Sequence, residues 1–257
     1  MVSGVPMRVL VCVKRVPAPG ARIVLTEDGR AVDTTLLSFT VSPHEECAVE
    51  EGVRLREAHD GTVTVLTLGP PEAEEQLRAA LAVGAQRAVL IPTDGSDWDP
   101  VSTATAITSA IKELEEADGV FDLILFGNES ADTGGYQVGI RVARALGRPV
   151  VSGIKGIDVA NGSARLRRDN PSGSEVYELA LPAVVAVREG INLPRYPTLK
   201  GRLNAKKIEV ETSDQERSES GQVMVRLIAP TQEVTETTIL EDAAAVVDIL
   251  EQLQVVK

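Results

Sequence analysis

The chain has 257 residues, and its 43% hydrophobic and 25% charged residues suit a folded α/β protein and exclude a fully disordered one. The formal net charge of −12 argues against a nucleic-acid or anionic-membrane binder, because either surface would repel the protein. Two cysteines, Cys12 and Cys47, and two histidines are too few for a disulfide framework or a metal centre. Apolar runs are of strand length and residues 1–7 lack the pattern of a signal peptide, so we expect a cytoplasmic protein without membrane insertion.

Residues 8–147 alternate between short apolar runs and segments with helical spacing. Asp28 and Gly29 between two apolar runs predict a β-hairpin, and Ser42, Pro43 and two acids predict a helix start. The expected order is strand 8–14, hairpin 23–33, helix from 42, strand 62–68, helix 72–83, strand 87–91, helix 101–116, strand 121–126 and helix 140–146.

This alternation predicts an open, mostly parallel, Rossmann-like sheet with helices on both faces. Ligands of such sheets bind beyond the carboxyl ends of the strands, where the strand order reverses. Cys12, Leu68 and Gly127 stand at predicted carboxyl ends. We therefore expect the loops after these strands to meet at one crevice.

A polar, glycine-rich turn follows the strand that ends near Phe126 and leads into a helix. Small residues let a backbone approach a ligand, and a helix N-terminus favours phosphate. The turn has neither a P-loop lysine nor the GxGxxG spacing, so a plain capped βα loop is an equal alternative. Ser42 to Glu45 form a second candidate turn, for which simple helix capping is the alternative.

After Val150 the pattern changes to short strands with turn signals between them, which predicts an antiparallel extension of the sheet over 157–187. Residues 211–221 are polar and rich in serine, as in a linker, and 238–255 have the apolar face of a helix. We expect a nucleotide-binding domain over 1–210 and an arm over 211–257 whose helix docks on a partner chain or on its own domain.

Five segments resemble the beta subunit of the heterodimeric electron transfer flavoproteins, of the bacterial type. They are residues 9–17 (VLVCVKRVP), 42–57, 77–90, 122–139 and 181–207, the last containing REGINLPRYPTLKGRLNAKK. The resemblance implies an adenine nucleotide alpha hydrolase-like fold that binds AMP and pairs with an alpha subunit carrying most of the FAD site. It implies an electron carrier and not an enzyme, which takes electrons from flavin dehydrogenases such as those of fatty acid oxidation and passes them to a respiratory-chain quinone reductase.

By matching position, the resemblance implies an AMP site made of two strand ends, a helix start and the glycine-rich turn. Its residues are Cys12, Ser42, Pro43, His44, Glu45, Leu68, Gly127, Asn128, Glu129, Ser130, Ala131, Asp132, Thr133, Gly134, Gly135, Tyr136, Gln137 and Val138. His44, Thr133 and Tyr136 depart from the usual family residues. Two alternatives stay open: a bifurcating variant with a second FAD in this site, and a stand-alone enzyme of the universal-stress or ATP-pyrophosphatase type.

Residues 190–196 resemble the loop with which the family docks on dehydrogenases. The implied partner-binding residues are Ile191, Asn192, Leu193, Pro194, Arg195 and Tyr196, with Ile191 as the apolar anchor. The prolines favour a projecting loop. The alternative is that Ile191 and Leu193 pack into the core and Arg195 pairs internally. Because this loop lies far along the chain from the 127–138 turn, we expect docking to be separable from nucleotide binding.

Overall fold

A computed structural model describes residues 6–219, 221–230, 239–240 and 242–255. Two predictions fall partly outside the described residues. The first concerns a signal peptide and includes residues 1–5, and the second is the final helix, which includes Thr238 and Glu241. The elements are β1 (Arg8–Cys12), β2 (Val16–Pro17), β3 (Phe39–Thr40), α1 (Pro43–His59), β4 (Thr62–Gly69), η1 (Pro71–Ala73), α2 (Glu74–Val83), β5 (Arg87–Pro92), α3 (Pro100–Asp118), β6 (Leu123–Gly127), α4 (Val138–Leu146), β7 (Val150–Ile154), β8 (Gly156–Ala160), β9 (Ser163–Asn170), β10 (Gly173–Ala180), β11 (Ala183–Val187), α5 (Leu199–Ala205), β12 (Val210–Thr212) and α6 (Ala243–Gln252).

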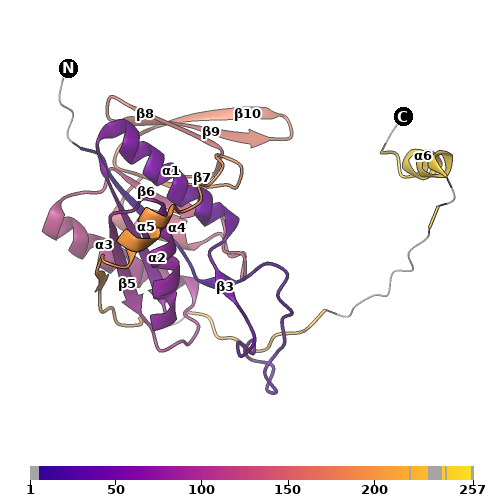
Figure 1. Cartoon of the computed structure of the whole chain (residues 1–257), viewed down its shortest axis with the longest axis horizontal. Coiled ribbons are helices and arrows are strands. Elements are labelled where there is room, and N and C mark those ends of the chain that lie inside the picture. Colours follow the sequence, from indigo (N-terminus) through magenta and orange to yellow (C-terminus); the bar gives the residue numbers. More distant parts are fainter. Residues whose placement is uncertain (1–5, 220, 231–238, 241, 256–257) are drawn as a thin grey trace.

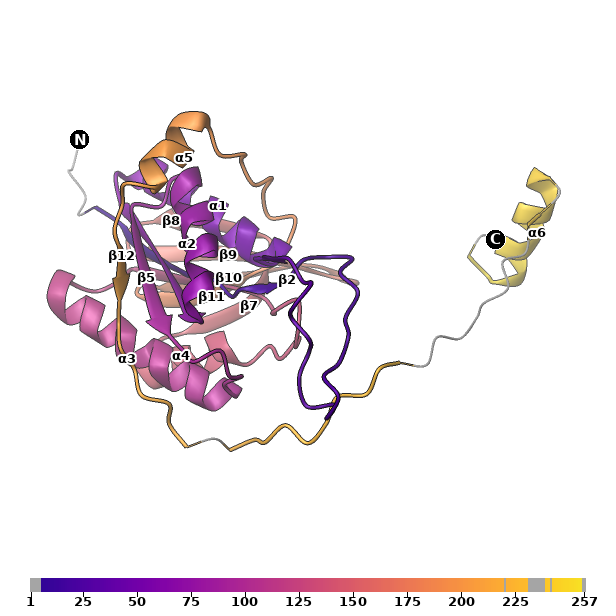
Figure 2. The same ribbon diagram turned by 60° about the horizontal axis from the view of Figure 1, so that its bottom comes forward.

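The centre of the molecule is a seven-stranded sheet in the order β12-β5-β4-β1-β6-β11-β7, and every pair in it is parallel. Helices α1, α2 and α5 cover one face and α3 and α4 the other (Figure 2). Val9 and Val11 point into the first apolar layer, and Leu10 points into the second. Burial on both faces explains why the central strands are continuous apolar runs, as the sequence predicts for a parallel α/β sheet.

Strands β8, β9 and β10 form a separate three-stranded antiparallel sheet beside the central one (Figure 1). The antiparallel pairing predicted for these strands is confirmed, but the strands form their own sheet and not the predicted extension of the central one, and the prediction is wrong for residues 183–187. Those residues are β11, which runs parallel between β6 and β7 and is buried along its whole length. Such a fully buried run is typical of a parallel strand covered on both faces.

The predicted hairpin at 23–33 is present only as one isolated bridge between Leu25 and Val32, inside the long segment that joins β2 to β3. The helix predicted from Ser42 begins as expected, at Pro43. After β11 the chain contains two elements that the sequence analysis missed, the short helix α5 and the edge strand β12. The latter extends the sheet two residues past the predicted domain boundary at 210, since Thr212 pairs with Leu90 of β5.

The segment predicted as a linker lies along the central domain before the chain leaves it (Figure 2). Ser213 and Gln215 donate hydrogen bonds to Glu113 of α3, and the Arg217 guanidinium lies over the ring of Trp98. Leu227 N donates to Gly29 O at 2.7 Å, which ties the arm to the β2–β3 segment. The terminal helix α6 begins at its cap Asp242 and has no buried residue among those described.

Candidate functional site

The strand order reverses between β1 and β6. From β1 the chain continues to β4 and β5 on one side, whereas β6, β11 and β7 lie on the other. Cys12 and Gly127 end the two central strands, and Cys12 is in register with Phe126. In doubly wound sheets, this reversal opens a crevice at the carboxyl edge. Two of the three strand ends predicted to border a ligand site, Cys12 and Gly127, therefore lie at the point of reversal.

Helix α1 starts at this crevice, and its own residues close its N-terminus. Ser42 Oγ accepts from Glu45 N at 3.3 Å, and Glu45 Oε2 accepts from Ser42 N at 3.0 Å, which is a capping box. Glu45 Oε1 also accepts from Lys14 N at 2.9 Å. Burial raises the pKa of Glu45 to about 7, although the hydrogen bonds from Ser42 and Lys14 oppose the rise. The capping box thus occupies the N–H groups of Ser42 and Glu45, as the capping alternative predicts.

The end of β6 packs tightly against this helix start. A Cβ added to Gly127 would lie 2.7 Å from Glu45 Cγ and 3.3 Å from His44 Cβ. Only glycine allows such an approach without displacement, which is the physical reason for this residue at the first position of the turn.

The turn after Gly127 is organised by Asp132. Its Oδ1 accepts from Thr133 N at 2.8 Å, and its Oδ2 lies 2.5 Å from Lys14 Nζ. Burial would raise the pKa of Asp132, but the charge and hydrogen bond of Lys14 outweigh it and the pKa is lowered. Lys14 was not among the predicted site residues, because it follows β1 and lies outside the glycine-rich turn in the sequence. The available signal was its place two residues beyond the end of β1.

Helix α4 begins where the turn ends, and its N-cap residue Gln137 makes no side-chain cap. The backbone N–H groups of the first turn, at Val138, Gly139 and Ile140, have no acceptor within the helix. Tyr136 just before it has φ +53° and is 54% exposed, and its hydroxyl pairs with Glu129. An uncapped helix start, preceded by a turn whose Asp132 pairs with Lys14, has the donors and the charge that a phosphate requires.

Two of the predicted site residues, Cys12 and Leu68, lie at or near the carboxyl ends of β1 and β4. Cys12 is buried, and burial followed by the charge of Glu45 raises the pKa of its thiol far above the usual range. Leu68 near the end of β4 packs against the same apolar layer as Val138. Cys12 and Leu68 both shape the site, and neither supplies a charged group to it.

The predicted docking loop follows β11, and its side chains point in different directions. Ile191 is half-buried and packs against the core on the α1 side of the sheet. Leu193 is 83% exposed and Tyr196 93% exposed. Arg195 pairs with Glu50 and Glu57 of α1. The expected projection of Ile191 is therefore wrong, and the exposed apolar side chain of this loop is Leu193.

The glycine-rich turn and the docking loop meet at His44. Its Nδ1 accepts from Glu189 N at 2.7 Å, and its Nε2 lies 3.4 Å from Glu129 Oε1. An Nδ1 that accepts a hydrogen bond leaves the imidazole proton on Nε2, facing Glu129. The two segments are distant in sequence but adjacent in space. Their distance along the chain therefore does not support the expectation that docking and nucleotide binding are separable.

A model of the electron transfer flavoprotein domain matches residues 32–218. The chain belongs to the electron transfer flavoprotein family. It is 36% identical over 215 residues to the electron transfer flavoprotein subunit beta of Syntrophomonas wolfei, which covers 83% of this chain and 82% of that protein. It is also 36% identical over 207 residues to the subunit beta of Bacillus subtilis, with 80% and 78% covered. Protein FixA of Azorhizobium caulinodans is 33% identical over 209 residues, with 79% and 74% covered.

The range matched by the electron transfer flavoprotein model contains α1, the turn after Gly127 and the docking loop. In the described part of the chain, no three His, Cys, Asp or Glu side chains are grouped as a metal site would need. No described helix is long and apolar enough to cross a membrane.

Proposed function

We propose that the chain is the beta subunit of a heterodimeric electron transfer flavoprotein. The heterodimer would accept electrons from flavin dehydrogenases, with acyl-CoA dehydrogenases as the leading class, and deliver them to a quinone reductase. FAD, held mainly by the alpha subunit, supplies the electron-carrying chemistry. In this proposal the beta chain makes and breaks no bond in a substrate; it binds a nucleotide and presents a docking surface.

The nucleotide is AMP, and the observation that carries this proposal is the uncapped start of α4 beside the β1–β6 crevice. The N–H groups of Val138, Gly139 and Ile140 would hold the phosphate, with Lys14 adding positive charge. Lys14 already pairs with Asp132, so a bound phosphate would share this cation with the carboxylate. Because the capping box of α1 already occupies the N–H groups of Ser42 and Glu45, these two residues would border the nucleotide and not donate to its phosphate.

The dehydrogenase would dock on the loop after β11, with Leu193 and Tyr196 making first contact. Both side chains are almost fully exposed. The loop residues next to them, Asn192 and Arg195, are held against α1 by hydrogen bonds. Apolar and tyrosine side chains at the centre of an interface contribute most of its binding energy when a partner's pocket covers them. Ile191 would support the loop from beneath.

The alpha subunit would receive helix α6. Val246, Val247, Ile249 and Leu253 leave apolar surface exposed on this helix. An amphipathic helix with an uncovered apolar face gains stability by burying it against another surface. A partner chain is the proposed surface because no described residue of α6 is buried against its own domain.

Co-expression tests this function. The chain purified together with the alpha subunit of the same organism should form a yellow complex that an acyl-CoA dehydrogenase reduces, and the chain expressed alone should be colourless. A colourless monomer that hydrolyses ATP would instead support the stand-alone enzyme.

A further inference from the structure

The docking loop has little backbone structure of its own. It runs from the end of β11 at Val187 to the start of α5 at Leu199. Within the described chain, one long backbone hydrogen bond closes inside the loop, from Ile191 N to Arg188 O at 3.4 Å. Pro194 and Pro197 have no N–H to donate. Side chains of other elements must therefore fix the loop's position.

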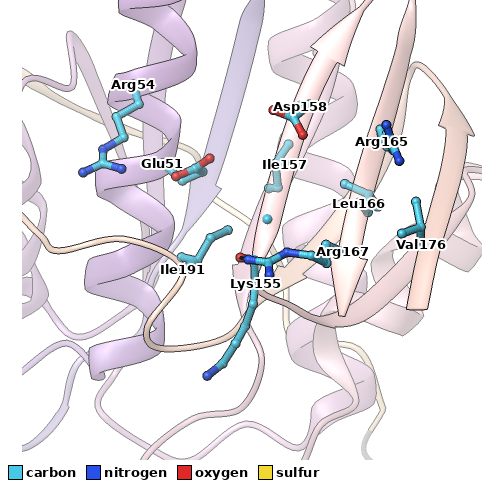
Figure 3. Close-up of a pocket in the computed structure, with 11 residues that line it drawn as sticks. Glu51, Arg54, Lys155, Ile157, Asp158, Arg165, Leu166, Arg167, Val176 and Ile191 are labelled. Carbon is cyan, nitrogen blue, oxygen red and sulfur yellow. Dashed lines mark hydrogen bonds between the residues drawn. The ribbon is translucent and has the colours of Figure 1, made fainter. Parts of the chain in front are cut away.

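Close packing beneath the loop is also incomplete. A cavity of about 420 Å³ lies between α1 and the three-stranded sheet, and Ile191 forms part of its wall. Figure 3 shows Glu51 of α1 and Ile191 of the loop facing Ile157 and Leu166 across this cavity. Ile191 thus contacts core on one side and open space on the other, so it alone does not hold the loop.

Helix α1 supplies the tethers through two loop residues. Asn192 Nδ2 donates to Cys47 O and to Glu51 Oε2, both at 2.9 Å. Arg195 makes more hydrogen bonds to the helix, and its partners are Glu50 and Glu57. These two residues are seven positions apart and so lie on one face of the helix. The three residues Glu50, Glu57 and Arg195 are called the clamp below.

The clamp uses four of the donor atoms of Arg195. Its backbone N and Nε donate to Glu50 Oε2 at 3.2 and 2.8 Å, and Nη2 donates to Glu50 Oε1 at 3.1 Å. Nη1 and Nη2 donate to the two carboxylate oxygens of Glu57 at 2.8 and 3.0 Å. Two-point pairing of a planar guanidinium with each carboxylate fixes its orientation as well as its distance.

The two carboxylates of the clamp differ in burial. The Glu50 side chain is 4% exposed, and that of Glu57 is 45% exposed. Burial alone would raise the pKa of Glu50, but the hydrogen bonds from Arg195 and Arg54 outweigh it and the pKa is lowered. A buried carboxylate that loses its main cation is strongly destabilised. The loop is therefore held in the position that brings Arg195 to Glu50.

We propose that Glu50 is the positioning residue of the docking surface. Glu50 fixes the position of Arg195. The exposed Leu193 lies two residues before Arg195, and the exposed Tyr196 lies one residue after it. Through the clamp both apolar side chains are presented in a set orientation before the partner arrives, which lowers the entropy lost on binding. This inference rests on the proposed docking role of the loop and adds the residue that holds it.

The test compares Glu50→Gln with Glu116→Gln in the heterodimer. Glutamine keeps the size and one acceptor of Glu50 but removes its charge. Glu116, exposed on α3, loses the same charge far from the loop and forms no hydrogen bond or ion pair with described residues. For Glu50→Gln, the KM for the dehydrogenase should rise roughly tenfold, because the loop must then be ordered during binding. The kcat and FAD content should stay within about twofold of wild type, and Glu116→Gln should match wild type throughout.

Hydrogen exchange gives a second readout that does not depend on electron transfer. Amides of residues 189–196 should exchange faster in Glu50→Gln, and Arg195→Gln should produce the same increase. The double variant should add little to either single one, because both remove the same pair. Unchanged exchange and KM in Glu50→Gln would overturn the positioning role. If exchange rises while neither Glu50→Gln nor Leu193→Ala changes KM, the clamp holds the loop but the loop is not the docking surface.

Discussion

Gly127→Ala tests the contact between β6 and α1 on which the crevice depends. The new methyl group would lie 2.7 Å from Glu45 Cγ and 3.3 Å from both Glu45 N and His44 Cβ. The Glu45 side chain has no free rotation with which to yield, since Ser42 N and Lys14 N both donate to it. The start of α1 must therefore shift, or the strand end must.

Overpacking of this kind costs about 1–3 kcal/mol of unfolding free energy, which corresponds to a melting temperature lower by roughly 2–10 °C in a chain of this size. Gly135→Ala is the matched control in the same turn. A Cβ there would have no heavy atom within 4 Å, and its φ is not in the left-handed region. It should leave the melting temperature unchanged or slightly higher, because alanine restricts the unfolded chain.

Thermal unfolding of the purified heterodimer measures both variants. Gly127→Ala should also release its nucleotide more readily, because α1 and the turn would no longer meet at the same distance. If Gly127→Ala melts with wild type and retains its nucleotide, the close approach of α1 to β6 is wrong.

Two further predictions concern the docking loop and the buried acid. Leu193→Ala should raise the KM for the dehydrogenase about tenfold or more in steady-state kinetics, at unchanged melting temperature. Ile191→Ala should instead lower the free energy of unfolding by about 1–2 kcal/mol, because its side chain packs against the core. If Ile191→Ala raises the KM and Leu193→Ala lowers the melting temperature, Ile191 is the anchor after all. Glu45 has an unfolded pKa of 4.5 and a folded pKa of about 7, so between these values the folded state holds more protons and stability falls as pH rises, by on the order of 3 kcal/mol. Denaturant unfolding at pH 5 and pH 8 should show this loss in wild type and a smaller one in Glu45→Gln; equal losses would mean that Glu45 does not carry a raised pKa.

The central strands were predictable because burial on both faces leaves a local signal. Runs such as 123–126 are apolar throughout, and each predicted site strand ends at a polar or glycine-rich loop. The residues of β11 gave the same apolar signal but followed a series of hairpin turns, and local order suggested antiparallel pairing where the chain in fact returns to the central sheet.

The remainder depended on contacts between distant segments. Lys14 and Asp132 are 118 residues apart, and Arg195 and Glu50 are 145 apart, so neither pair leaves a pattern in a short window. Whether Ile191 or Leu193 faces solvent depends on how the clamp rotates the loop, which the local sequence does not encode. Strand β12 was missed because three residues at a sheet edge are too few for periodicity to identify.

The nucleotides released from the denatured heterodimer test the proposed function most directly. Mass spectrometry and absorbance of the released material should identify FAD and AMP in equal amounts, with AMP lost first from Gly127→Ala. Two FAD per heterodimer and no AMP would contradict the proposed AMP site and establish the bifurcating variant in its place.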